Sequence, residues 1–117
     1  MNFNKVIISG RTTERPELKS LPSGQSVTNF SIASTRTWTD KSGKKQEQTE
    51  FSRCVFFGKT AETIAKFVEK GQVLLVEGRL QTRSWEKEGK KFYMTEIVGE
   101  SFQFGERSKK AQQEGRT

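Results

Sequence analysis

A single uninterrupted stretch of strand-forming residues restricts the fold of this chain more than any other feature. Residues 26–38, SVTNFSIASTRTW, contain no glycine or proline and are rich in valine, threonine, isoleucine and aromatic side chains, which favour a β-strand. Phe30 and Ile32 are suited to a core. Arg36 and Trp38 share their strand face but are not suited to a core. We therefore expect one long strand with a bend or bulge before Arg36.

The remaining strands are predicted from the same kind of pattern. They are residues 3–9, 51–57, 72–85 and 91–98. In residues 51–57, alternation places on one face Phe51, Arg53, Val55 and Phe57. In residues 72–85, Leu80 is expected to face the core, and the residues expected to face solvent are Arg79, Gln81, Arg83 and Trp85.

One segment has the pattern of a helix. Residues 60–70, TAETIAKFVEK, place Ile64, Phe67 and Val68 at the spacing of one helical face. This predicts an amphipathic helix of roughly three turns, with Gly71 as the cap of its end.

The connecting segments are marked by their composition. Proline, serine and glycine predict a loop over residues 11–25, and residues 39–50, which lack any large apolar side chain, predict a mobile polar loop between antiparallel strands. Residues 86–91 predict a turn. We expect residues 105–117 to form a disordered basic tail.

The expected order of elements is three strands, one helix and two strands. That order is typical of an all-β, five-stranded OB-fold Greek-key barrel with one α-helix between strands 3 and 4, here over residues 1–104. A closed barrel also explains how a chain with only 31% hydrophobic residues holds together, because closure pairs the strand edges and the helix plugs one end.

Composition indicates a polyanionic partner and argues against catalysis. The 21 Lys and Arg residues against 14 Asp and Glu residues give a formal net charge of +7. Histidine is absent and Cys54 is the one cysteine, which removes histidine-based triads, histidine-containing zinc sites and an internal disulfide. We expect no enzymatic activity, no catalytic residue, no metal and no cofactor. The glutamates are scattered, and we expect them to act only as solubilising charge.

Two features bear on location. No run approaches the roughly 18 apolar residues that a membrane span needs, and the N-terminal residues do not have the pattern of a signal peptide. We expect a cytoplasmic protein without a membrane partner.

Aromatic and basic side chains are interleaved on the predicted strands. Trp38 neighbours Arg36 and Lys41; Phe51 and Phe57 flank Arg53, with Lys59 beyond; Trp85 follows Arg79 and Arg83, with Lys87 next. An exposed tryptophan leaves apolar surface uncovered unless a ligand covers it. Unpaired bases are flat, apolar on both faces and tied to phosphates, so a ring beside a cation suits each nucleotide. Stacking contributes about 1–3 kcal/mol per base and tolerates any sequence.

Each of these side chains also has a structural interpretation. Taken alone, an aromatic residue in a strand is more often part of a core or an interface, and we assign Phe30 and Phe56 to the core. Trp38 and Trp85 favour binding instead, because both end strands that carry arginine and neither has apolar neighbours in the sequence.

In these stretches the chain resembles the bacterial single-stranded DNA-binding proteins. The resemblance runs from Asn4 to about Phe104 and rests on NKVIISG, PELKSLPSG, VTNFSIAST, TEFSRCVFFGKTAE, FVEKGQVLLVEGRLQTRSW and YMTEIV. It implies an OB fold, a homotetramer, single-stranded DNA wrapped across the aromatic and basic faces, a role in DNA replication, recombination and repair, and a location at the nucleoid.

The resemblance also implies particular contacts. The family's base-stacking aromatics fall on Trp38, Phe51, Phe57 and Trp85, and its basic contacts on Lys41, Arg53, Lys59, Lys70 and Arg83. The chain departs from the family at Phe51, where tryptophan is common, at Gln81, where a basic residue can occur, and at Ser52, where some members carry histidine. Family members typically continue to an acidic tip that docks replication and repair enzymes; this sequence stops at Thr117, so it predicts DNA coating and makes no prediction of docking.

Two other functions fit the same pattern of residues. A single-stranded RNA-binding chaperone of the cold-shock kind would use the same rings, because stacking does not distinguish the sugars. A structural oligomerisation subunit would bury the exposed aromatics in a protein interface.

Overall fold

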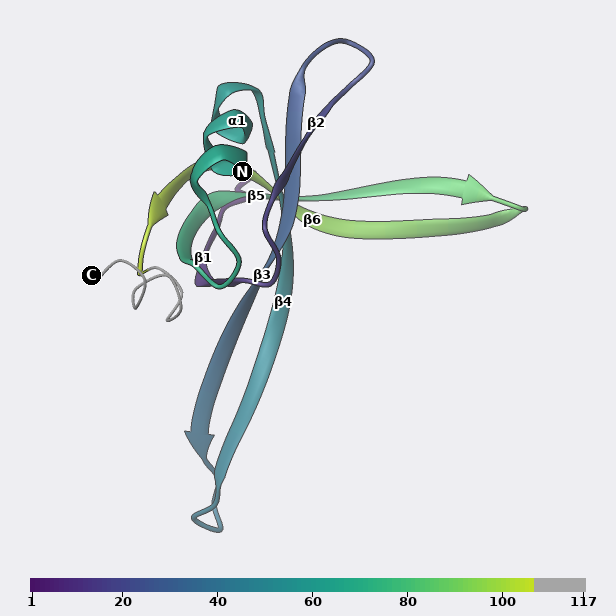
Figure 1. Ribbon diagram of the computed structural model, residues 1–117. Helices are drawn as coiled ribbons and strands as arrows, with labels where there is room; N and C mark the ends of the chain where they lie inside the picture. Colours follow the sequence, from purple (N-terminus) through teal and green to yellow (C-terminus); the bar gives the residue numbers. More distant parts are fainter. Residues whose placement is uncertain (107–117) are drawn as a thin grey trace, which may run out of the picture.

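The computed structural model describes residues 1–106 of the 117-residue chain. Its elements are β1 (Val6–Thr12), β2 (Glu17–Ser20), β3 (Ser26–Thr39), β4 (Lys45–Phe57), α1 (Gly58–Phe67), β5 (Val73–Lys87) and β6 (Lys90–Phe104) (Figure 1). Most of the predicted basic tail, residues 107–117, lies outside the described residues. Gly105 and Glu106, at its start, exchange backbone hydrogen bonds with Val73.

Five of the strands close into a barrel. The order around it is β1, β5, β6, β4, β3 and back to β1, with β4 and β6 parallel and the other pairs antiparallel. The sixth strand, β2, lies on the edge of β3. Helix α1 connects the third and fourth strands of the barrel, so the predicted five-stranded OB-fold topology and the place of its helix are confirmed.

Apolar side chains from the strands and from α1 fill the barrel. The largest buried ones are Phe30, Phe56, Ile32, Ile64, Leu74 and Val68. The rings of Phe30 and Phe56 lie parallel, with centroids 6.0 Å apart, which confirms that both belong to the core. The helix ends at Phe67, where the N–H of Val68 donates to the carbonyl of Ile64. It therefore stops before the predicted Gly71 cap.

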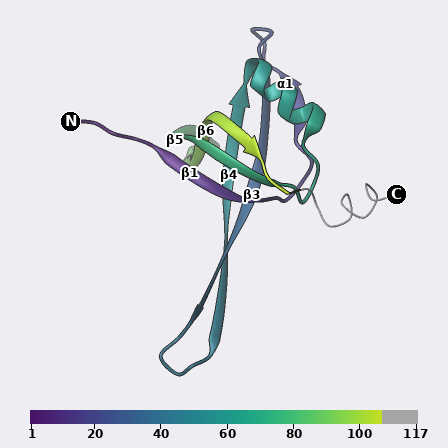
Figure 2. The ribbon, with the colours of Figure 1, turned by 90° about the vertical axis from the view of Figure 1, so that its left-hand side faces the viewer.

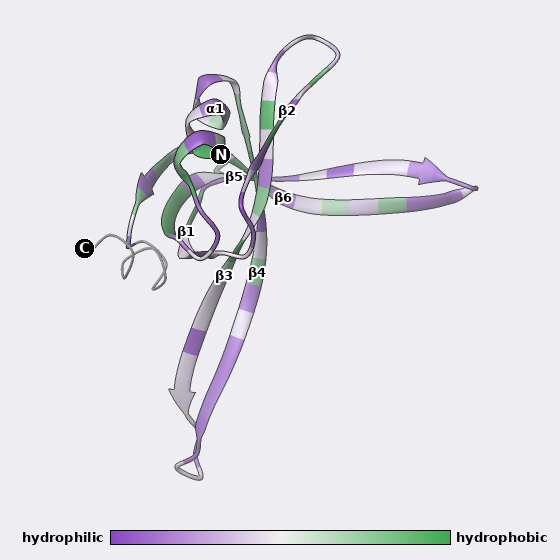
Figure 3. Cartoon of the chain, viewed as in Figure 1, coloured by the Kyte–Doolittle hydropathy of each residue, from purple (hydrophilic) through white to green (hydrophobic). Residues whose placement is uncertain are grey.

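Two long hairpins extend out of the barrel (Figure 1). We call residues 34–50, from the distal parts of β3 and β4, the first arm, and residues 81–95, from β5 and β6, the second arm. The second view shows the first arm standing clear of the barrel body (Figure 2). Both arms are largely hydrophilic (Figure 3). Leu80 was predicted to face the core, but it is exposed, because β5 is leaving the barrel at that point.

Three further sequence predictions were wrong in detail. Residues 45–50, assigned to a polar loop, continue β4. The short β2 lies inside the predicted loop 11–25, where the hydroxyl of Thr28 donates to the carbonyl of Glu17. Of the bend or bulge predicted in β3, the bulge is absent, since the register of β3 with β4 is continuous from Val27 to Thr39. In each case cross-strand hydrogen bonds order polar residues that local composition assigns to a loop or a break.

Within residues 1–106, α1 is the one helix, and its 10 residues are too few and too polar to cross a membrane.

Candidate nucleic-acid interface

Six of the twelve predicted site residues share one face of the sheet. The ladder pairs Val55 of β4 with Val98 of β6, and Val98 with Arg79 of β5, so alternate residues of these strands point away from the core on the same side. We call this the outer face. The predicted residues that it carries are Phe51, Arg53 and Phe57 of β4 and Arg79, Arg83 and Trp85 of β5.

A carboxylate links two of these arginines. The Nε of Arg83 donates to Glu96 at 3.1 Å, and the Nε of Arg53 lies 3.7 Å from the other oxygen of the same carboxylate. The Nη2 of Arg53 also donates to the Oδ1 of Asn29 at 2.9 Å. The side chain of Glu96 is only 11% exposed. The prediction that every glutamate is solubilising charge is therefore wrong for Glu96.

This ion-paired cluster borders a shallow groove of about 390 Å³ on the outer face. Its apolar part includes Phe57, beside the small buried cluster of Val27, Val55 and Val98. Basic side chains stand at its edge. The groove is lined by Lys19, Ser20, Leu21, Val27, Asn29, Arg53, Val55, Phe57, Arg83 and Glu96. An apolar floor with cations beside it fits a flat base attached to a phosphate.

The second arm carries a stacked aromatic pair. Trp85 and Phe92 face each other across the arm, with ring centroids 5.9 Å apart and planes 20° from parallel. The guanidinium of Arg83 lies 5.2 Å from the Trp85 ring, and Trp85 remains 39% exposed. Sequence reasoning missed Phe92, although its alternation with Met94 and Glu96 in the return strand could have indicated it.

The first arm carries an arginine beside a tryptophan, on the face opposite to the outer face. The guanidinium of Arg36 lies 4.6 Å from the ring of Trp38, which is 37% exposed. In the β3–β4 ladder Trp38 is opposite Gln46, and Phe51 is opposite Ala33. The two aromatics therefore lie on opposite faces of the ladder, so the structure does not gather all predicted rings on one surface.

Lys41 lies in a turn that Asp40 organises at the tip of the first arm. The Oδ1 of Asp40 accepts from the backbone N–H and the hydroxyl of Ser42 and from the N–H of Lys44, and its Oδ2 accepts from Gln46. The Ser42 hydroxyl, followed by the Gln46 amide and the Lys44 N–H, lowers the pKa of Asp40 from 3.8 to about 2.

The other predicted cations are distributed around the barrel. Lys59 is exposed in the first turn of α1, two residues beyond Phe57, and Lys87 lies at the end of β5, at the tip of the second arm. Lys70 lies in the turn after α1, which is held against β1 by the hydrogen bond from Thr12 to the Glu69 carbonyl. Lys70 is therefore not on the outer face.

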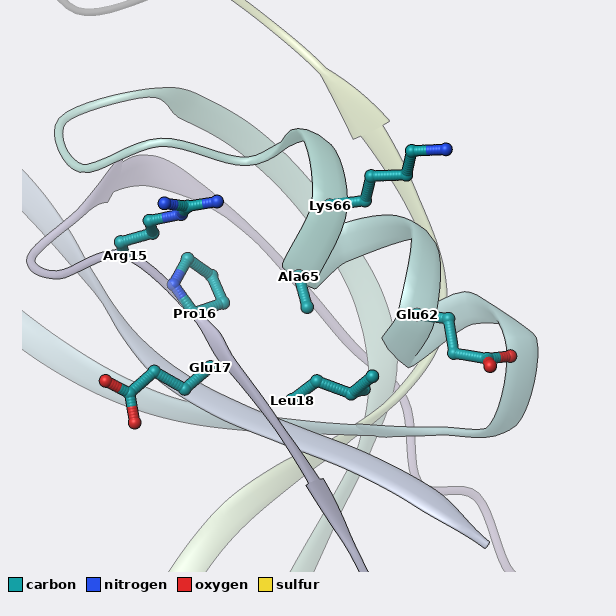
Figure 4. A pocket seen from close by; sticks show the side chains of 7 residues that line it. All are labelled: Arg15, Pro16, Glu17, Leu18, Glu62, Ala65 and Lys66. Carbon is teal, nitrogen blue, oxygen red and sulfur yellow. The ribbon is translucent and has the colours of Figure 1, made fainter.

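A further hollow lies away from the outer face. It lies between β2 and α1 (Figure 4), measures about 680 Å³, and is lined by Arg15, Pro16, Glu17, Leu18, Glu62, Ala65 and Lys66. Its charges are mixed and it contains none of the predicted rings. Residues 1–106 contain no group of three acidic or cysteine side chains placed to hold a metal ion.

These features define an OB-fold protein. The barrel has five strands, its third and fifth strands pair in parallel, and its helix lies between strands 3 and 4. Two long arms that carry aromatic rings extend from it. The chain belongs to the single-strand binding protein family, whose model matches residues 3–105.

Curated relatives and solved structures agree with this assignment. The chain is 43% identical over 103 residues to single-stranded DNA-binding protein 3 of Listeria innocua serovar 6a and 41% identical over 103 residues to single-stranded DNA-binding protein 2 of Listeria monocytogenes serovar 1/2a. Each match covers 87% of this chain, which spans 63% of the relative's length.

Two solved structures share the fold. The Plasmodium falciparum SSB in complex with ssDNA superposes with a TM-score of 0.82 at 28% identity, over 91% of this chain and 97% of that one. A deletion mutant of the Thermus aquaticus single-stranded DNA binding protein gives 0.79 at 34% identity, over 89% and 51%.

Proposed function

We propose that this chain binds and coats single-stranded DNA without marked sequence preference. Bases stack on Trp38, Phe51, Phe57 and Trp85, and phosphates contact Arg36, Lys41, Arg53, Lys59, Lys70, Arg79, Arg83 and Lys87. The observation that carries the proposal is that both tryptophans are partly exposed on projecting arms, each with a guanidinium within 4.6 or 5.2 Å of its ring. A ring beside a cation matches a base joined to its phosphate.

The placement of these residues, apart from Lys70, supports a path that follows both arms and the outer face between them. Trp38 and Phe51 lie on opposite faces of the β3–β4 ladder, so a bound strand passes around this ladder rather than along a flat surface. Such wrapping needs a flexible, unpaired strand. A stiff duplex does not bend this sharply over so few nucleotides.

The biological role follows from the binding. We propose that the chain protects unpaired DNA in replication, recombination and repair, in the cytoplasm at the nucleoid, and that it acts without catalysis. Docking of replication and repair enzymes forms no part of this proposal.

We also propose that four copies assemble. Strand β1 pairs with β3 only at Arg11 and Thr12, which leaves the edge of its first residues open to another strand. Ile7 of β1 and Leu75 of β5 are exposed nearby. Light scattering after gel filtration should give four times the chain mass of 13.4 kDa; the mass of a single chain would contradict assembly.

Competition binding tests the proposed function. A fluorescein-labelled oligothymidylate should be displaced by unlabelled oligothymidylate, weakly by oligouridylate and not by a duplex of the same length. Affinity should fall by about 0.7 log units per phosphate contact for each tenfold rise in salt. Displacement by oligouridylate at equal concentration would instead favour the RNA chaperone, and absence of binding would favour the structural subunit.

A further inference from the structure

Glu96 has a position that its charge alone does not explain. It is an acidic side chain on a face whose neighbouring charges are basic, and it is nearly buried, at 11% exposure. A carboxylate next to a phosphate path opposes binding, so its presence there calls for a compensating role.

The contacts of Glu96 indicate that role. Its two oxygens approach two arginines from different strands, Arg53 of β4 at 3.7 Å and Arg83 of β5 at 3.1 Å. Arg53 is held a second time by Asn29 of β3. Both arginines line the groove beside Phe57. Long arginine side chains otherwise lose rotamer freedom when they bind a phosphate.

We propose that Glu96 is a positioning residue of the interface, which holds Arg53 and Arg83 at the groove edge and limits the net charge that they present. The inference rests on the proposed function and deepens it. With one carboxylate between two guanidiniums, the cluster presents a net charge of about one positive unit, since each arginine stays protonated. Phosphates then bind to cations that are already in place, with less counterion release than two unpaired arginines would give.

Charge and position can be separated by two substitutions. Glu96→Gln keeps the shape but removes the charge, and its one oxygen acceptor can still hold one of the two guanidiniums. It should raise affinity for oligothymidylate at low salt by roughly fivefold, the effect of one unit charge about 4 Å away in water. It should also steepen the plot of log affinity against log salt by about 0.7.

Glu96→Asp keeps the charge but shortens the side chain, so it no longer reaches both guanidiniums. It should weaken binding severalfold at every salt concentration while the salt slope stays at the wild-type value. Wild-type affinity in this variant would contradict a positioning role. If Glu96→Gln fails to fold in a thermal melt, Glu96→Asp decides the question.

Matched controls exclude a general charge effect. Glu62→Gln makes the same change in net charge on the exposed side of α1 and should leave the slope unchanged. In an Arg53→Ala/Arg83→Ala background, adding Glu96→Gln should no longer steepen it. An unchanged slope for Glu96→Gln in the wild-type chain would overturn the inference. A wild-type chain that does not bind oligothymidylate would instead overturn the proposed function.

Discussion

Trp85 and Phe92 stack across the second arm, with centroids 5.9 Å apart, and Phe92 thereby holds in place an indole that remains 39% exposed. A ring fixed before binding loses little rotamer freedom when a base stacks on it. This makes the second arm the part of the surface where the structure most favours base stacking.

Replacing Trp85 with alanine should lower the affinity for oligothymidylate by about 1–3 kcal/mol and leave the melting temperature nearly unchanged. Phe92→Ala should have a smaller effect in the same direction, because it removes only the support of the indole. Tyr93→Ala is the control, since Tyr93 is exposed on the opposite face of the same arm. Anisotropy titrations and thermal melts measure both quantities, and a collapse of the fold in Trp85→Ala would show that this indole is structural.

Adjacent phenylalanines in β4 give a matched test of core against surface. Phe56 is 1% exposed and Phe57 is 39% exposed. Phe56→Ala should reduce the free energy of unfolding by about 3–5 kcal/mol, because it leaves a cavity against Phe30.

Phe57→Ala should instead cost little stability and weaken DNA binding. Urea denaturation followed by circular dichroism measures the first effect, and anisotropy the second. Equal destabilisation by the two substitutions would contradict the assignment of faces in β4.

The carboxyl group of Asp40, in the turn at the tip of the first arm, should titrate at unusually low pH. The pKa of Asp40 is lowered to about 2 in the fold, against an ordinary value of 3.8, so the ionised carboxylate stabilises the turn above pH 3.8 and this contribution is lost as the pH falls through 2. The backbone amide resonances of Ser42 and Lys44 should therefore shift with a midpoint near 2. In Asp40→Asn they should not titrate in this range, and a midpoint near 3.8 in the wild type would show that the turn is not formed.

Cys54 should be unreactive in the folded protein. Its side chain is fully buried, and burial raises the pKa of the thiol from 9.0 to about 12. A disulfide reagent at pH 8 should modify it only after unfolding in urea. The raised pKa also predicts that stability is lost as the pH rises from 9 towards 12, because the unfolded thiol ionises first. Rapid modification of the native protein at pH 8 would contradict the core described here.

Much of the barrel could be predicted because its strands are patterned by burial. Runs such as residues 51–57 alternate or are uniformly apolar, and the helix places Ile64 and Val68 on one face. The first arm was harder to predict, since both its faces meet solvent and residues 39–50 contain no large apolar side chain. Residues 45–50 form a strand because β3 pairs with them along the whole arm, a long-range fact that their own composition does not contain.

The sequence predicted individual residues of the candidate site, but not the contacts between side chains from different strands. Exposed aromatics next to arginine in sequence were also next to it in space, as with Arg36 and Trp38. The role of Glu96 could not be predicted, because it depends on contacts with two arginines from other strands. The order of strands around the barrel, with β6 between β4 and β5, brings those three residues together.

Tryptophan emission measures most directly whether bases stack on the exposed indoles. The chain has two tryptophans, so Trp38→Phe leaves Trp85 as the only emitter. Titration with a long oligothymidylate should quench emission in the wild type and in this variant, and the quenching should saturate together with binding followed by anisotropy. Binding that leaves the emission of both proteins unchanged would contradict stacking on these rings.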